Sequence, residues 1–201
     1  MKMNLCLQWG LSLLLLLSGV VDSKEYHRNL QQRIIGGFKA NQARYPYYTF
    51  LRIITGGGRF YYCGGTLVAE DMVLSAAHCV MGIGQVTQIV AWVNHTTSGD
   101  VEFTRYEYER QATRRIPHPN YNNRTMANDL VLIKLDYPVK GVALPRMNSD
   151  EYSPVDGQSL TVFGFGLTSN PGRRSDSLME VAVNTVSHQD CKDENSHHGR
   201  I

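Results

Sequence analysis

The residues with the clearest chemical potential lie in the stretch LSAAHC, where His78 and Cys79 follow two alanines at the end of a short apolar segment. A histidine is a common general base, because its pKa lies close to neutral pH. Cys63 lies sixteen positions before Cys79. A disulfide between the two cysteines would hold the neighbour of the imidazole in place and close a loop worth roughly 3 kcal/mol. The alternative is a structural histidine in a disulfide-linked β-domain.

A second candidate is Asp129, which directly precedes the apolar run LVLI at residues 130–133, expected to be a buried strand. A carboxylate that enters a core is costly unless it is paired. If its partner were a ring N–H of His78, the carboxylate would fix the tautomer of the imidazole, and the other ring nitrogen could accept a proton. The alternative is an ordinary Asn-Asp turn before a strand.

A third candidate is the junction between Arg33 and Ile34, within the sequence RIIGG. A basic residue before two apolar residues and two glycines is typical of a processing site. Cleavage after Arg33 would create a new ammonium group on Ile34. The flexible glycines would allow the new N-terminus to turn inward, where a buried carboxylate could pair with the ammonium group. The alternative is an unremarkable loop.

Composition excludes several classes of partner and ligand. The chain of 201 residues has 20 Lys and Arg against 18 Asp and Glu, so its net charge of +2 gives no reason to expect nucleic acid or an anionic membrane as a partner. Cys63, His78 and Cys79 do not have the spacing of a common zinc motif. We therefore expect neither a metal nor a cofactor.

The N-terminus predicts a secretory signal peptide over residues 1–23. Lys2 is its positive end, residues 11–21 form a Leu-rich core, and Ser23 offers a small residue for cleavage. This uninterrupted apolar run is shorter than the roughly 20 residues that a membrane-spanning helix needs. We therefore expect a secreted, extracellular protein that has no membrane attachment once the signal is removed.

Secretion also bears on the cysteines and on two asparagines. Cysteines pair in an oxidising compartment. Removal of Cys6 with the signal leaves Cys63, Cys79 and Cys191, so one thiol is expected to lack a partner. Asn94 and Asn123 begin the triplets Asn-His-Thr and Asn-Arg-Thr, which are acceptors for N-glycosylation and are compatible with exposed loops.

The elements that must position these residues are short strands. Segments rich in β-branched and aromatic residues, several of which alternate with period two, are separated by turns that contain Gly or Pro. The strands are expected at residues 47–54, 59–68, 86–93, 101–108, 130–135, 159–163 and 179–186. This all-β pattern suits a barrel or a sandwich, with a seam near residues 141–156.

Taken in order, these motifs resemble one family, the chymotrypsin-like (trypsin-type) serine peptidases. The matching segments are RIIGG at 33–37, CGGTLV at 63–68, LSAAHC at 74–79, HPNYN at 118–122, NDLVLIKL at 128–135, GFG at 164–166 and LMEVAV at 178–183, followed by Cys191. One departure is Phe165, where the family usually has Trp.

The resemblance implies an all-β, trypsin-like double β-barrel that hydrolyses peptide bonds through a His-Asp-Ser triad. It implies a peptidase domain at 34–201, with the first barrel at about 34–145 and part of the second at about 146–201, after an activation peptide at 24–33. His78 would be the general base and Asp129 its orienting carboxylate. Cys63 would pair with Cys79, and Arg33–Ile34 would be the activation cleavage site.

The larger departure concerns the nucleophile. The family's serine follows the aspartate in a GDSGG segment, and no serine after Asp129 lies in GDSGG or in G-x-S-x-G. We therefore expect a chain that is truncated before this serine and inactive as given, with the partner of Cys191 beyond Ile201. Expected partners are protein or peptide substrates, protease inhibitors and an activating protease. The alternative is a secreted, non-catalytic homologue that acts as a protein-binding regulator or decoy.

Overall fold

The fold is that of a computed structural model, which describes residues 4–5, 37–95, 108–150, 154–166, 175–187 and 189–191. Most of the expected signal peptide, the junction at Arg33 and Ile34, and all but the last residue of the strand expected at 101–108 lie outside the described residues. Within the part that is described, no helix is long and apolar enough to cross a membrane.

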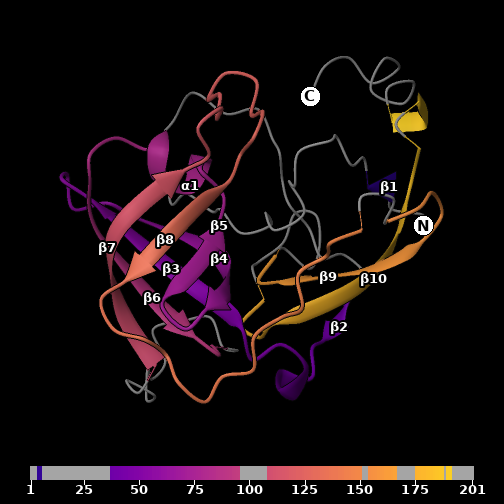
Figure 1. Cartoon of the computed structure of the whole chain (residues 1–201), viewed down its shortest axis with the longest axis horizontal. Coiled ribbons are helices and arrows are strands. Elements are labelled where there is room, and N and C mark those ends of the chain that lie inside the picture. Colours follow the sequence, from indigo (N-terminus) through magenta and orange to yellow (C-terminus); the bar gives the residue numbers. More distant parts are fainter. Residues whose placement is uncertain are drawn as a thin grey trace.

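Six antiparallel strands close into a barrel in the order β3-β4-β5-β8-β7-β6. Figure 1 shows this barrel beside a second, smaller sheet. The strands of the barrel are β3 (Tyr48–Thr55), β4 (Phe60–Ala69), β5 (Met72–Ser75), β6 (Val86–Val93), β7 (Glu109–Pro117) and β8 (Val131–Leu135). One short helix, α1 (His78–Met81), follows β5.

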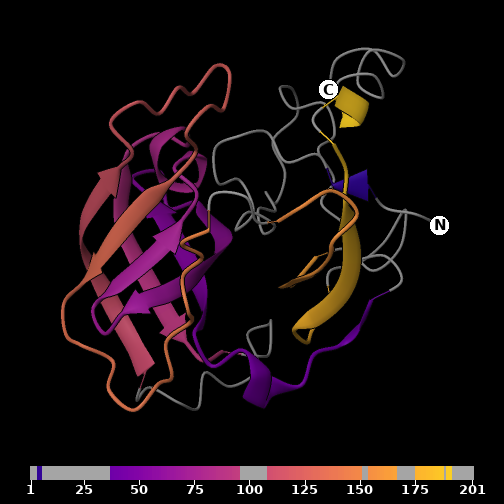
Figure 2. The same ribbon diagram turned by 45° about the vertical axis from the view of Figure 1, so that its right-hand side comes forward.

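The second sheet is built around β10 (Met179–Thr185). This strand pairs antiparallel with β9 (Ser159–Gly164) and with β2 (Phe38–Lys39), and parallel with β1 (Asn4–Leu5). A short 3₁₀ helix, η2 (Gln42–Arg44), leads from β2 to the barrel. The two sheets lie side by side in both Figure 1 and Figure 2. The expectation of an all-β fold with a complete first barrel and a partial second one is confirmed.

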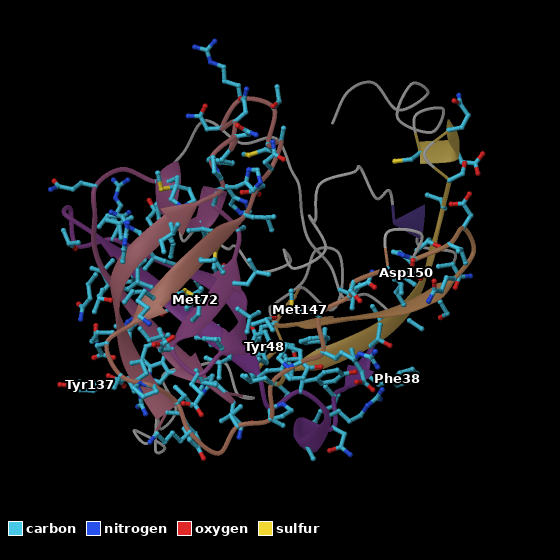
Figure 3. All side chains as sticks on the ribbon, viewed as in Figure 1. Phe38, Tyr48, Met72, Tyr137, Met147 and Asp150 are labelled. Atoms are coloured by element: carbon cyan, nitrogen blue, oxygen red, sulfur yellow. A yellow bond between two sulfur atoms is a disulfide. The ribbon has the colours of Figure 1, made fainter. Side chains whose placement is uncertain are left out.

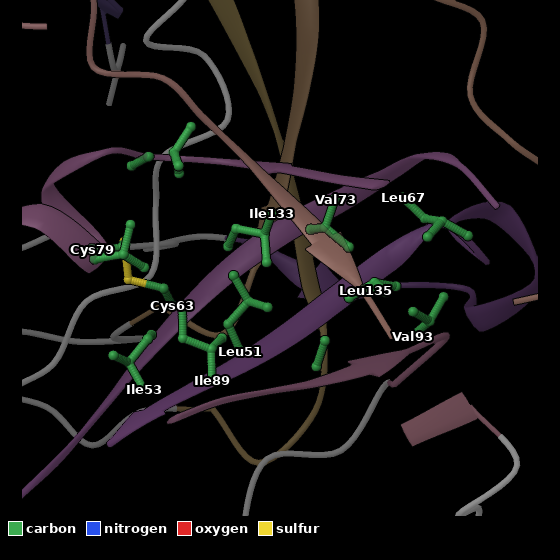
Figure 4. Close-up of a cluster of buried hydrophobic side chains, with 14 of the residues drawn as sticks. Leu51, Ile53, Cys63, Leu67, Val73, Cys79, Ile89, Val93, Ile133 and Leu135 are labelled. Carbon is green, nitrogen blue, oxygen red and sulfur yellow. A yellow bond between two sulfur atoms is a disulfide. The ribbon is translucent and has the colours of Figure 1, made fainter. Parts of the chain in front are cut away.

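β3 and the second half of β6 bury side chains on both of their faces. Side chains alternate across a strand, so neighbouring residues point to opposite sides. Leu51 and Ile53 of β3 point into the barrel core, which is drawn in Figure 4, together with Ile89 of β6. Phe50, next to Leu51, and Trp92, three positions after Ile89, belong instead to a cluster on the outer side of the barrel. These strands therefore link the barrel to the second sheet.

That outer cluster, here called the interface cluster, is mainly aromatic. Its buried members are Ala40, Tyr45, Tyr48, Phe50, Val90, Trp92, Phe165 and Leu178. The ring of Tyr45 stacks on Phe163 of β9 at a centroid distance of 4.1 Å, and Phe50 meets Phe165 edge to face at 5.6 Å. Tyr48 lies between the barrel and the second sheet in Figure 3. Aromatic pairs of this kind add to the stabilisation from burial, so they fasten the second sheet to the barrel.

Candidate active site

His78 is the first residue of α1, and the chain around it is tightly held. The two alanines before it, Ala76 and Ala77, are completely buried. Cys79, which follows it, forms a disulfide with Cys63 of β4, visible in Figure 4. The last turn of α1 is held as well, because a guanidinium N–H of Arg115 on β7 donates to the backbone carbonyl of Val80 at 2.9 Å. Strands on both sides therefore fix the backbone of His78.

Asp129 lies just before β8, at the end of an unusual turn. Asn128 has a positive φ of 55°, and its carbonyl accepts a hydrogen bond of 2.7 Å from the backbone N–H of Leu130. Asparagine is among the few residues that tolerate this left-handed conformation. The side-chain amide of Asn128 donates to the carbonyl of Asn120 at 3.0 Å. The turn thus directs the carboxylate of Asp129 inward, where the residue is only 4% exposed.

The pairing of β5 with β8 brings His78 and Asp129 together. Ser75, at the end of β5, lies opposite Val131 at the start of β8. One carboxylate oxygen of Asp129, Oδ1, accepts a hydrogen bond of 2.8 Å from the backbone N–H of His78. The other, Oδ2, lies 2.6 Å from the ring atom Nδ1 of His78. Each oxygen therefore holds a different part of the same residue.

This geometry decides what the imidazole can do. An ionised carboxylate only accepts hydrogen bonds, so the ring hydrogen lies on Nδ1 of His78. The second ring atom, Nε2, then has a free lone pair that can accept a proton. The side chain of His78 is 25% exposed, whereas that of Asp129 is 5% exposed. A reacting group can thus approach the histidine, while the carboxylate behind it stays away from water.

Tyr121 lies close enough to Asp129 for the two side chains to interact electrostatically. The pKa of the Tyr121 hydroxyl is raised, chiefly because burial disfavours the phenolate and secondly because the carboxylate of Asp129 repels it. Tyr121 also lines a pocket of about 560 Å³ together with Met81, Asn122, Asn123 and Arg124. Sequence reasoning did not find this pocket, because its walls come from α1 and from a loop forty positions later.

The side chains of Cys63, His78 and Cys79 lie as close to one another as the ligands of a metal ion. The atom that each residue offers lies within 4.8 Å of the other two, and Nε2 of His78 lies 3.7 Å from Sγ of Cys79. Zinc takes sulfur ligands as thiolates. Because both sulfurs are joined in a disulfide, the cluster offers the imidazole but no thiolate.

Cys191 corrects one expectation from the sequence. We expect it to be unpaired, yet it is buried and disulfide-bonded, and none of the cysteines among the described residues is free.

The remaining candidates are the activation junction and the two glycosylation acceptors. Arg33 and Ile34 lie outside the described residues. Asn94 follows β6, is half-buried and has a positive φ of 56°. Asn123 is exposed and lies at the pocket beside the pair.

Comparisons with known proteins identify related sequences and structures. A sequence model of the family described as Trypsin matches residues 34–201. Duodenase-1 of Bos taurus is 34% identical over 165 residues, which cover 79% of this chain and 61% of that protein. Serine protease 1 of Rattus norvegicus is 31% identical over 189 residues, which cover 90% of this chain and 70% of that protein.

A solved structure titled "Structure of GrC" superposes with a TM-score of 0.66 at 27% identity, covering 80% of this chain and 69% of the other. A collagenase structure gives the same TM-score at 25% identity. The chain spans only about three fifths of the length of the first relatives that it matches, 61% or 62% in each case.

Proposed function

From the premise that this chain belongs to the trypsin family of serine proteases, we propose that it supplies the acid–base half of a secreted endopeptidase. The observation that carries the proposal is the double contact between Asp129 and His78, at 2.8 Å and 2.6 Å. It supports a general base in the required tautomer, with Nε2 open to a substrate. In this role His78 takes a proton from the nucleophile and later gives it to the leaving amine, while Asp129 stabilises the imidazolium between the two steps.

The nucleophilic serine in this proposal lies C-terminal to Ile201. No serine after Asp129 stands in a GDSGG or G-x-S-x-G segment. Without the nucleophile and the oxyanion-hole donors beside it, the base has nothing to activate, and residues 1–201 alone should not hydrolyse peptides.

The proposal includes secretion and activation. The signal peptide at 1–23 sends the chain out of the cell, and the segment 24–33 keeps it inactive until an activating protease cuts after Arg33. Cleavage then creates the ammonium group on Ile34. Proteins or peptides are the substrates, and protease inhibitors are expected partners.

The test compares the 201-residue chain with the same chain extended through the downstream reading frame. Both are cleaved after Arg33 and assayed for hydrolysis of arginyl, lysyl and aromatic peptide esters. The extended chain should be active and the short one inactive. Asp129→Asn in the extended chain should lower kcat by about 10⁴-fold, a size measured on triads of this same family rather than worked out from this structure.

His78→Ala in both chains is the control for contaminating proteases. Turnover by the short chain that His78→Ala abolishes would contradict the proposal and reveal an unrecognised nucleophile. A reading frame that ends without a GDSGG segment would instead favour the non-catalytic regulator or decoy.

A further inference from the structure

The pocket beside His78 has an N-glycosylation acceptor in its wall. Its lining residues are Met81, at the end of α1, and Tyr121, Asn122, Asn123 and Arg124, from the loop before β8. Asn123, Arg124 and Thr125 form the acceptor triplet. The side chain that would carry a sugar therefore belongs to the pocket itself.

Two of the residues that line the pocket, Met81 and Tyr121, lie near the paired His78 and Asp129. Met81 lies three residues after His78 on the same helix. Tyr121 is near enough to Asp129 for the carboxylate to help raise its pKa, after the larger effect of burial. Anything attached at the mouth of this pocket would therefore lie beside the approach to the imidazole.

The loop that carries Asn123 has a defined shape. A β-bridge joins Asn122 to Ala127 and closes its base. The side-chain oxygen of Asn122 accepts hydrogen bonds from the backbone N–H groups of Arg124, at 2.9 Å, and Thr125, at 3.2 Å. Asn122 is thus engaged in the turn, while Asn123 is exposed at its tip. A glycan on Asn123 would start from a fixed position.

We propose that a glycan on Asn123 screens the pocket beside His78, so that small molecules enter freely while large ones are slowed. The inference rests on the proposed secretion. In the modification, Nδ2 of Asn123 loses a proton and bonds to the anomeric carbon of an oligosaccharide carried on a polyprenyl diphosphate. The bond from that carbon to the diphosphate oxygen breaks, and the polyprenyl diphosphate leaves. The glycan is bulky and hydrophilic, so it excludes proteins from the space that it sweeps.

The experiment measures access to the pocket rather than catalysis. The full chain is secreted from eukaryotic cells with the reporter substitution Met81→Cys, at a pocket residue that is 45% exposed. The new thiol is labelled with iodoacetamide or with a polyethylene glycol maleimide, before and after enzymatic removal of N-glycans. Deglycosylation should speed labelling by the polymer several-fold and leave labelling by iodoacetamide unchanged.

Matched variants separate the pocket from the rest of the surface. Tyr137→Cys reports on a residue that is 70% exposed and lies far from the loop in Figure 3, so its labelling should not change. Asn123→Gln should reproduce the effect of deglycosylation, whereas Thr125→Ser keeps the acceptor triplet and should behave as the parent. Arg124→Cys, at the permissive middle position of the triplet, is a second reporter if Met81→Cys does not fold.

The outcomes separate this inference from the proposed function. Peptide mapping that finds glycan on Asn94 but not on Asn123 would overturn the screen and leave secretion intact. A chain that is retained in the cytosol would overturn both. Glycan on Asn123 with equal polymer labelling before and after its removal would also overturn the screen.

Discussion

Gly65 of β4 is a position at which a single methyl group should weaken the barrel. A Cβ atom there would lie 2.6 Å from Cγ1 of Val73, 3.1 Å from the carbonyl oxygen of Leu74 and 3.4 Å from Cδ1 of Leu51. Nonbonded carbon atoms pack at about 3.5–4.0 Å, so the contact with Val73 is roughly 1 Å too short. Val73 and Leu51 are both completely buried, so neither has open space to move into.

We expect Gly65→Ala to lower the free energy of unfolding by about 1–3 kcal/mol, the usual effect of one extra carbon in a packed core. For a chain of this length, each kcal/mol lowers Tm by about 2–4 °C. Urea unfolding followed by circular dichroism measures the change. Gly57→Ala is the control, because a Cβ there meets no atom within 4 Å. It should stay within about 0.5 kcal/mol of the parent.

A second substitution tests the proposed cause. Val73→Ala removes the atom in the shortest contact, so Gly65→Ala with Val73→Ala should cost less than the sum of the two single changes. Rescue should be incomplete, because the carbonyl of Leu74 remains 3.1 Å from the new Cβ. The reasoning is refuted if Gly65→Ala costs no more than Gly57→Ala, or if the two changes are simply additive.

Three further predictions concern the disulfide and two tyrosines. Replacing Cys63 and Cys79 together by alanine should lower the free energy of unfolding by about 3 kcal/mol in urea, because their link restricts the unfolded chain. Tyr48→Phe should raise it by about 1 kcal/mol, since the hydroxyl is buried with no hydrogen-bond partner among the described residues; a clear loss would contradict this. Burial, followed by a hydrogen bond to Glu180, raises the pKa of Tyr45 from 10.0 to about 12. The folded chain therefore keeps a proton that the unfolded chain loses between these pH values, and stability should fall as pH rises through them. Tyr45→Phe should make that fall shallower in unfolding measured from pH 9 to 12.

Most strands of the fold could be predicted, because they are rich in the β-branched and aromatic residues that are typical of buried strands. β3, β4, β6, β8, β9 and β10 begin and end within one residue of the expected bounds. β7 (Glu109–Pro117) could not be predicted, since its sequence ERQATRRIP is largely polar and none of its residues is fully buried. It becomes a strand because β6 and β8 pair with it on either side, and that pairing closes the barrel. Such an effect of tertiary structure cannot be predicted from the local sequence.

Some parts of the candidate site could likewise be predicted from the sequence, and others could not. His78 and Asp129 could be singled out, because each stands in a recognisable motif next to an apolar segment. The pocket could not, because it depends on how closely α1 approaches the loop at 121–124. The expectation that Cys191 is unpaired was wrong, because it rested on a count of cysteines and the residue is disulfide-bonded.

The closed barrel has a consequence for how the protein is made. All six of its strands, the disulfide and the pair formed by His78 and Asp129 fall between Tyr48 and Leu135. Chains leave the ribosome N-terminus first and fold in units as they emerge. The histidine can therefore acquire its orientation while β9 and β10 are still being translated. Ribosome-bound chains stalled once Leu135 has cleared the exit tunnel should already resist proteolysis across β3 to β8, and chains stalled before β8 emerges should not.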